Sequence, residues 1–75
     1  MSYNGWKNWE TWNIAFWLGN DELLYSLALR ANSYSELIET LKCYSQGPHT
    51  PDGSYWGSKK VDRKAITSMI KEMQQ

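Results

Sequence analysis

The residues best suited to nucleophilic or metal chemistry in this 75-residue chain are its single histidine and its single cysteine. His49 and Cys43 are six positions apart, with Pro48 between them. A structural zinc site takes four ligands, and a Cys–His nucleophile pair needs a third group that orients the base. The sequence places no such further residue at a suitable spacing. We therefore expect no metal, no cofactor and no enzymatic activity, with His49 in a loop and Cys43 half-buried.

An aromatic and basic segment is the best case for binding of a nucleic acid. Its members are Tyr55, Trp56, Lys59, Lys60, Arg63 and Lys64. Single strands are bound by aromatic rings that stack on bases and by cations that contact phosphates. The same residues also fit a solvated basic surface. Nucleic-acid binding is therefore the alternative function and not the first one.

Four of the five tryptophans lie within twelve consecutive residues. One tryptophan can bury about 150–250 Å², so we expect this segment to supply much of the core. Trp9, Trp12 and Phe16 share one stripe of a helix and are predicted to face inward. Trp6 and Trp17 lie off this stripe. They are candidates for contact with a protein partner, because tryptophan is enriched at such interfaces.

Polar side chains interrupt the aromatic run at Glu10, Thr11 and Asn13. We expect them to satisfy backbone groups and to cap neighbouring elements, because buried polar groups are hydrogen-bonded. A role of Asn13 in binding a partner is the alternative. Tyr55 and Trp56 complete the candidate protein-binding residues, and Trp56 is also expected to fold back over the core.

The charges are balanced in total and unequal along the chain. Eight basic and eight acidic residues give a net charge of zero, with −3 in residues 1–40 and +3 in residues 41–75. A balanced chain is not typical of a dedicated nucleic-acid coat or of an acidic DNA mimic. No apolar run approaches the roughly 18 residues that a membrane span needs, and no signal-peptide pattern is present. We expect a protein of the host cytoplasm without a membrane partner.

Capping residues and apolar spacing predict an all-α fold, a single domain over residues 1–75. The four predicted helices follow potential N-caps at Asn8, Asp21, Ser33 and Asp62. The first is predicted over residues 9–18, ending at Gly19–Asn20. The third is predicted to end near Gln46–Gly47, because Pro48 cannot continue it.

The segment between the third and fourth predicted helices, residues 47–60, is expected to be an ordered loop. Pro51-Asp52-Gly53 is a strong turn signal within it, with a short hairpin near Thr50–Trp56 as an option. Val61 and Ile66 are spaced as a hydrophobic staple at the start of the last helix. Gln74 and Gln75 are expected to fray.

Two motifs carry a resemblance to a known family. The first is Asn4-Gly5-Trp6-Lys7-Asn8-Trp9-Glu10-Thr11-Trp12-Asn13, and the second is Thr50-Pro51-Asp52-Gly53 followed by Trp56. With these the chain resembles small uncharacterised proteins of bacteriophages and bacteria. The resemblance implies a phage or mobile-element setting, and it brings no catalytic residues. Lys59-Lys60 makes the segment after the turn more basic than the family pattern.

Three hypotheses follow. In the first, the chain is a non-enzymatic accessory protein that binds and inhibits or modulates a host protein, such as a defence or nucleic-acid-processing complex. In the second, it binds nucleic acid through residues 55–64. In the third, it forms a homodimer that shares the first helix across a two-fold axis.

Overall fold

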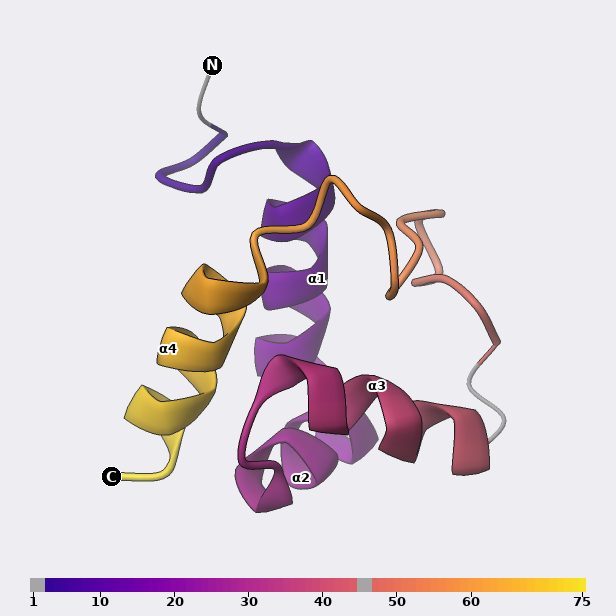
Figure 1. Cartoon of the computed structure of the whole chain (residues 1–75), viewed down its shortest axis with the longest axis vertical. Helices are drawn as coiled ribbons and strands as arrows, with labels where there is room; N and C mark the ends of the chain where they lie inside the picture. Colours follow the sequence, from indigo (N-terminus) through magenta and orange to yellow (C-terminus); the bar gives the residue numbers. More distant parts are fainter. Residues whose placement is uncertain (1–2, 45–46) are drawn as a thin grey trace.

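Four helices and one long loop make up the fold (Figure 1). The computed structural model describes residues 3–44 and 47–75. Its helices are α1 (Trp9–Asn20), α2 (Glu22–Arg30), α3 (Tyr34–Cys43) and α4 (Arg63–Met73). Within these described ranges, β-pairing is limited to the isolated bridges Tyr3–Trp6 and His49–Tyr55. The predicted all-α class is confirmed.

The helices pack in two layers that the loop ties together. In Figure 1, α2 and α3 cross the lower end of α1, α4 lies along the side of α1, and the loop passes over the upper end of α1. Helix α1 packs against α2 and α4, and α3 packs against α4 and α2. The loop and the start of α4 therefore meet the first turns of α1, although they are distant in sequence.

Each helix begins at the predicted N-cap. The cap side chains accept hydrogen bonds from the backbone amides of Thr11 (2.9 Å), Leu24 (3.0 Å), Glu36 (3.2 Å) and Ala65 (3.1 Å). Ser33 and Glu36 have the spacing that predicts a capping box, in which the Glu36 side chain accepts from the Ser33 amide. The Glu36 carboxylate accepts from the amide of Asn32 at 3.2 Å, and thus closes the turn one residue earlier than predicted.

The C-terminal ends of α1 and α3 differ in detail from the prediction. Helix α1 includes Gly19 and ends at Asn20, within the predicted Gly19–Asn20 end, and the amide of its C-cap Asp21 donates to the Trp17 carbonyl at 3.0 Å. The Asn20 side chain donates to the Phe16 carbonyl at 2.7 Å. A side chain therefore satisfies the last turn, and no left-handed residue is needed there. Helix α3 ends at Cys43, and Gln46, near which its end was predicted, lies outside the described residues.

The core is mainly aliphatic, and this corrects the expectation of a tryptophan core. Its buried apolar members among the described residues are Ile14, Ala15, Leu18, Leu24, Leu27, Ala28, Ala31, Tyr34, Leu37, Leu41, Trp56, Val61, Ile66 and Ile70. Trp56 is 4% exposed and covers the core as predicted, while Trp6 and Trp17 pack against its edge.

The predicted inward stripe of α1 is not its buried face. Phe16 is 42% exposed, and Trp9 and Trp12 are only partly buried. The buried face carries Ile14 and Leu18 instead. Because α1 is apolar on nearly every side, its periodicity favours no single face.

The C-terminal end is anchored, which corrects the expected fraying at Gln74. Val61 and Ile66 are both buried, as the predicted staple requires. Beyond the end of α4, the Gln74 side chain donates to the carbonyls of Ala28 and Ala31. It thereby ties the residues after α4 to the end of α2, where the Ala28 carbonyl also accepts from the Ala31 amide at 3.2 Å.

Candidate functional site

The polar residues of the opening motif fasten the loop to α1. Asn13 donates from Nδ2 to Asp52 Oδ2 at 2.9 Å, and its Oδ1 accepts from Thr50 Oγ1 at 2.6 Å. Trp17 donates from Nε1 to the same Asp52 oxygen at 2.9 Å. Ser54 Oγ donates to the Glu10 carbonyl at 3.1 Å. We call Asn13, Trp17, Thr50, Asp52 and Ser54 the polar clamp.

A second set of hydrogen bonds holds the segment before α4. Asn8 Nδ2 donates to the Lys60 carbonyl at 2.6 Å, and Thr11 Oγ1 accepts from the Asp62 amide at 2.9 Å. The prediction that these polar side chains satisfy backbone groups is confirmed for Thr11, whereas Asn13 bonds the side chains of Asp52 and Thr50 instead. The Glu10 side chain instead forms an ion pair with Lys60 Nζ at 3.8 Å. Its backbone carbonyl accepts the hydrogen bond from Ser54 in the loop.

The clamp shifts the titration of its carboxylate. The hydrogen bond from Asn13, and next the one from Trp17, lower the pKa of Asp52, because both stabilise the charged form. Desolvation opposes this shift and is the smaller effect. The ionised carboxylate is therefore the form that the fold selects.

Four rings form a row on the outside of the molecule. The ring centroids of Tyr3 and Trp12 are 4.9 Å apart, those of Trp12 and Phe16 are 5.6 Å apart, and those of Phe16 and Trp17 are 5.6 Å apart. Tyr3 is 41% and Phe16 42% exposed. We call Tyr3, Trp12, Phe16 and Trp17 the aromatic row, and it is the candidate protein-binding surface.

The sequence-predicted protein-binding residues are not all accessible. Asn13 is 1% and Trp56 4% exposed, so neither can present a contact surface as it stands, and this corrects their place among those candidates. Asn13 is buried by the loop that it binds, and Trp56 by the core. Trp6 is partly buried, whereas Tyr55 is 58% exposed, with its ring edge-on to His49 at 5.5 Å.

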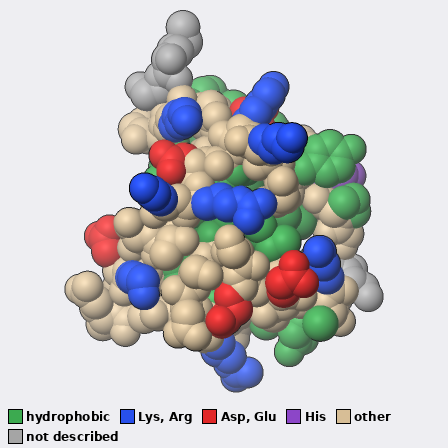
Figure 2. Space-filling view, viewed as in Figure 1, with side chains coloured by type: hydrophobic (Ala, Val, Ile, Leu, Met, Phe, Trp, Pro, Cys, Tyr) green, Lys and Arg blue, Asp and Glu red, His purple; other side chains and the backbone are tan. Residues whose placement is uncertain are grey.

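The predicted basic residues lie on the surface. Lys59, Lys60, Arg63 and Lys64 are all exposed. Figure 2 shows lysine and arginine side chains spread over this face of the molecule, with apolar side chains between them. Arg63 donates from Nη1 to Ser35 Oγ at 3.1 Å, which joins the start of α4 to α3.

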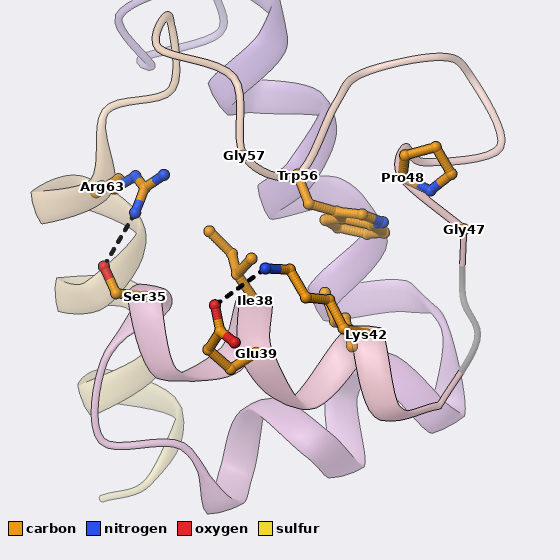
Figure 3. Close-up of a pocket in the computed structure, with 10 residues that line it drawn as sticks. Ser35, Ile38, Glu39, Lys42, Gly47, Pro48, Trp56, Gly57 and Arg63 are labelled. Carbon is orange, nitrogen blue, oxygen red and sulfur yellow. Dashed lines mark hydrogen bonds and ion pairs between the residues drawn. The ribbon is translucent and has the colours of Figure 1, made fainter.

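A pocket of about 490 Å³ opens beside this basic face (Figure 3). Helix α3, the loop and the first residue of α4 enclose it. It is lined by Ser35, Ile38, Glu39, Leu41, Lys42, Gly47, Pro48, Trp56, Gly57 and Arg63. Sequence reasoning missed this site, because its walls come from three separate segments. Two of its lining residues had been predicted as contacts, Trp56 with a protein partner and Arg63 with a nucleic acid.

The histidine and the cysteine both lie on the surface. Cys43 is exposed, which corrects the half-buried position expected for it. His49 lies in the loop, with Nδ1 2.9 Å from the Thr50 carbonyl oxygen. Across residues 3–44 and 47–75, no group of three or more His, Cys, Asp or Glu side chains is placed to hold a metal ion. No helix in this part of the chain has the length and apolar character of a membrane span.

One family model matches the chain from residue 1 to residue 75. The chain belongs to DUF7249, a family of unknown function. No curated protein and no solved structure matches it. The matched region includes both the opening motif and the Thr-Pro-Asp-Gly turn. These are the two segments that the polar clamp joins.

Proposed function

We propose that this DUF7249 chain is a non-enzymatic accessory protein of a phage or mobile element, which binds and modulates a host protein. The observation that carries the proposal is the aromatic row on the outside of α1. Aromatic side chains dominate the binding energy of many protein interfaces. The phage setting is supported by the resemblance at the opening motif.

The side chains of the aromatic row are already ordered in the free protein. Trp17 is fixed by its hydrogen bond to Asp52, and each ring of the row packs against the next. Ordering a side chain on binding costs about 0.5–1.5 kcal/mol, so a row that is already ordered avoids part of this cost. Steric occlusion of a host surface would need no catalytic group.

The experiment compares capture by the wild type with capture by a Tyr3→Ala/Phe16→Ala variant. Immobilised protein is incubated with bacterial lysate, and a recovered protein is then purified and titrated directly by calorimetry. We expect loss of about 2 kcal/mol or more of binding free energy in the variant, as for hot-spot residues. Tyr25→Ala is the matched control, since Tyr25 is 41% exposed and lies on α2 outside the row. A double variant that keeps its helicity and still binds the purified partner would refute the role of the row.

Nucleic-acid binding is the second candidate, favoured by the exposure of Lys59, Lys60, Arg63 and Lys64. Binding of phosphates by cations releases counterions from the nucleic acid, so the affinity for a labelled single strand should fall steeply between 25 and 150 mM salt. The expected fall in the binding constant is roughly 0.7 log units per phosphate contact for each tenfold rise in salt. Fluorescence anisotropy measures this with DNA and RNA oligonucleotides. If neither strand binds at the lower salt, this function is eliminated.

A further inference from the structure

Helix α4 carries an open groove in which every charged side chain is positive. The groove has a volume of about 390 Å³ and is lined by Arg63, Lys64, Thr67, Ser68 and Lys71. Three of these side chains are cations and two carry hydroxyls, and none of the five is acidic or aromatic. We call these five residues the α4 groove.

The cations of the α4 groove follow one stripe along the helix. Arg63, Thr67 and Lys71 succeed one another at intervals of four residues, which places them on one side of α4. Lys64 is two turns before Lys71 and lies on the same side. A different side, which carries the fully buried Ile66, packs into the core. At 1.5 Å per residue the stripe is about 12 Å long.

The charges of this stripe are not neutralised within the protein. The ion pairs formed by residues 3–44 and 47–75 include no member of the α4 groove. Arg63 donates to the neutral hydroxyl of Ser35, as Figure 3 shows. Two carboxylates are close in sequence: Asp62 caps the helix, and Glu72 lies about 100° further around the axis than Lys71. Three cations therefore remain available to an anion from outside.

The hydroxyl groups of the α4 groove add hydrogen-bond donors. Thr67 Oγ1 accepts from the Tyr34 amide at 3.0 Å, and its own proton has no acceptor among the described residues. Ser68 is exposed beside it. Cations and hydroxyls are the side chains that contact phosphate oxygens in complexes with nucleic acids. Both kinds of phosphate contact are thus present on one helix.

This composition fits a nucleic acid better than a protein or a membrane. The centre of a protein interface is typically depleted in charged residues and enriched in rings. A helix that lies on a membrane inserts an apolar face between the lipids. The α4 groove offers neither rings nor apolar side chains, since all five of its residues are cations or alcohols. Its chemistry matches a dense row of phosphates.

The lack of rings also favours a duplex over a single strand. Single strands are bound by aromatic stacking, and Trp56, a ring predicted for that role, is 4% exposed and part of the core. Tyr55 is exposed but does not line the α4 groove. A B-DNA duplex carries one phosphate per roughly 1.7 Å of its axis, so a stripe of about 12 Å meets several phosphates in any register.

We propose that the α4 groove binds the phosphate backbone of a nucleic-acid duplex without preference for base sequence. Arg63, Lys64 and Lys71 contact phosphates, and Thr67 and Ser68 donate hydrogen bonds to them. The inference rests on the second candidate function, nucleic-acid binding, and moves its site from the aromatic loop to α4. It is independent of the aromatic row, which shares no residue with the groove.

Fluorescence anisotropy compares a labelled duplex of about 20 base pairs with its separate strands at 25 mM salt. We expect the duplex to bind at least about tenfold more tightly, and a duplex of shuffled sequence to bind equally well. With three phosphate contacts, the association constant should fall by roughly 2.7 log units for each tenfold rise in salt. DNA and RNA duplexes are titrated in parallel, and the tighter of the two identifies the nucleic acid.

The outcomes separate this inference from the function on which it rests. A single strand that binds as tightly as the duplex overturns the inference and leaves the second candidate function standing. A duplex that binds only one base sequence also overturns it. If neither the duplex nor the single strands bind at 25 mM salt, both fail.

Variants locate the site on α4. Lys64→Gln and Lys71→Gln should each weaken duplex binding and lower the slope of log affinity against log salt by about 0.9. Lys7→Gln is the matched control, because it removes the same charge from an exposed lysine that does not line the groove. Equal weakening by all three variants would show a general charge effect and overturn the site. So would tighter binding to vesicles that contain phosphatidylserine than to the duplex, since it would assign the groove to a membrane surface.

Discussion

Asn13 shows how much one side chain can determine in so short a chain. Its amide uses both ends, as a donor to Asp52 and as an acceptor from Thr50, and it is 1% exposed. The sequence predicted that this residue satisfies backbone groups, whereas its partners are side chains. It could not predict the partners, because Thr50 and Asp52 are 37 and 39 positions away and no local pattern connects them.

Replacement of Asn13 by leucine should destabilise the fold. The variant leaves the Thr50 hydroxyl without its acceptor and removes one donor from Asp52, so we expect a loss of about 2 kcal/mol in the free energy of unfolding. Urea unfolding followed by circular dichroism measures it. Asn32→Ala, at an exposed asparagine, should cost less than about 0.5 kcal/mol. Similar losses in both variants would mean that the clamp contributes little.

The clamp also predicts a dependence of stability on pH. The native pKa of Asp52 is lowered, so its contribution is complete above the unfolded aspartate value of about 3.9 and is lost as the pH falls through the native value. The stability difference between the wild type and Asp52→Asn should therefore shrink as the pH is lowered from 7 to 3. Thermal unfolding of both proteins across this range tests it. A constant difference would contradict the assignment.

At the scale of elements, the starts of the helices were predictable and their orientation was not. Caps depend on a side chain and an amide three residues on, so Asn8, Asp21, Ser33 and Asp62 could be identified locally. The buried face of α1 depends on what packs against it. Since both faces of this helix are apolar, only the contact with α2 and α4 decides between them. The pocket was unpredictable for the same reason.

The corrected orientation of α1 predicts which truncations matter. Leu18→Ala removes a fully buried side chain and should cost about 2–5 kcal/mol. Phe16→Ala, two positions earlier and 42% exposed, should cost less than about 1.5 kcal/mol. Chemical denaturation of the two variants compares them. A larger loss of unfolding free energy for Phe16→Ala than for Leu18→Ala would mean that the stripe of Trp9, Trp12 and Phe16 contributes to the core after all.

At the scale of the whole molecule, the available surface limits association. The chain exposes 4825 Å² in total, and a stable interface takes about 800 Å² from each partner. A two-fold dimer would need a self-complementary patch of that size. The aromatic row consists of four rings that are each partly covered, and they supply only a fraction of it. A partner must therefore also contact residues around the row.

We accordingly expect the isolated chain to be monomeric. Light scattering at micromolar concentration should give the mass of one chain, 8.8 kDa, and this mass should not change between 25 and 300 mM salt. The two halves of the sequence carry opposite net charges, so copies attract each other weakly at low salt, and salt screens this attraction. We expect the attraction to be too weak to form a dimer even at 25 mM salt. A mass of two chains that returns to one in Phe16→Ala would instead support the homodimer through α1.

The exposed thiol at the end of α3 has a practical consequence. Cys43 is the sole cysteine of the sequence, and it follows directly on Lys42 in the pocket wall. A maleimide dye would consequently attach at one known place without any engineering of the chain. The emission of the dye would change when a ligand occupies the neighbouring pocket. The five native tryptophans would act as donors for energy transfer to the dye.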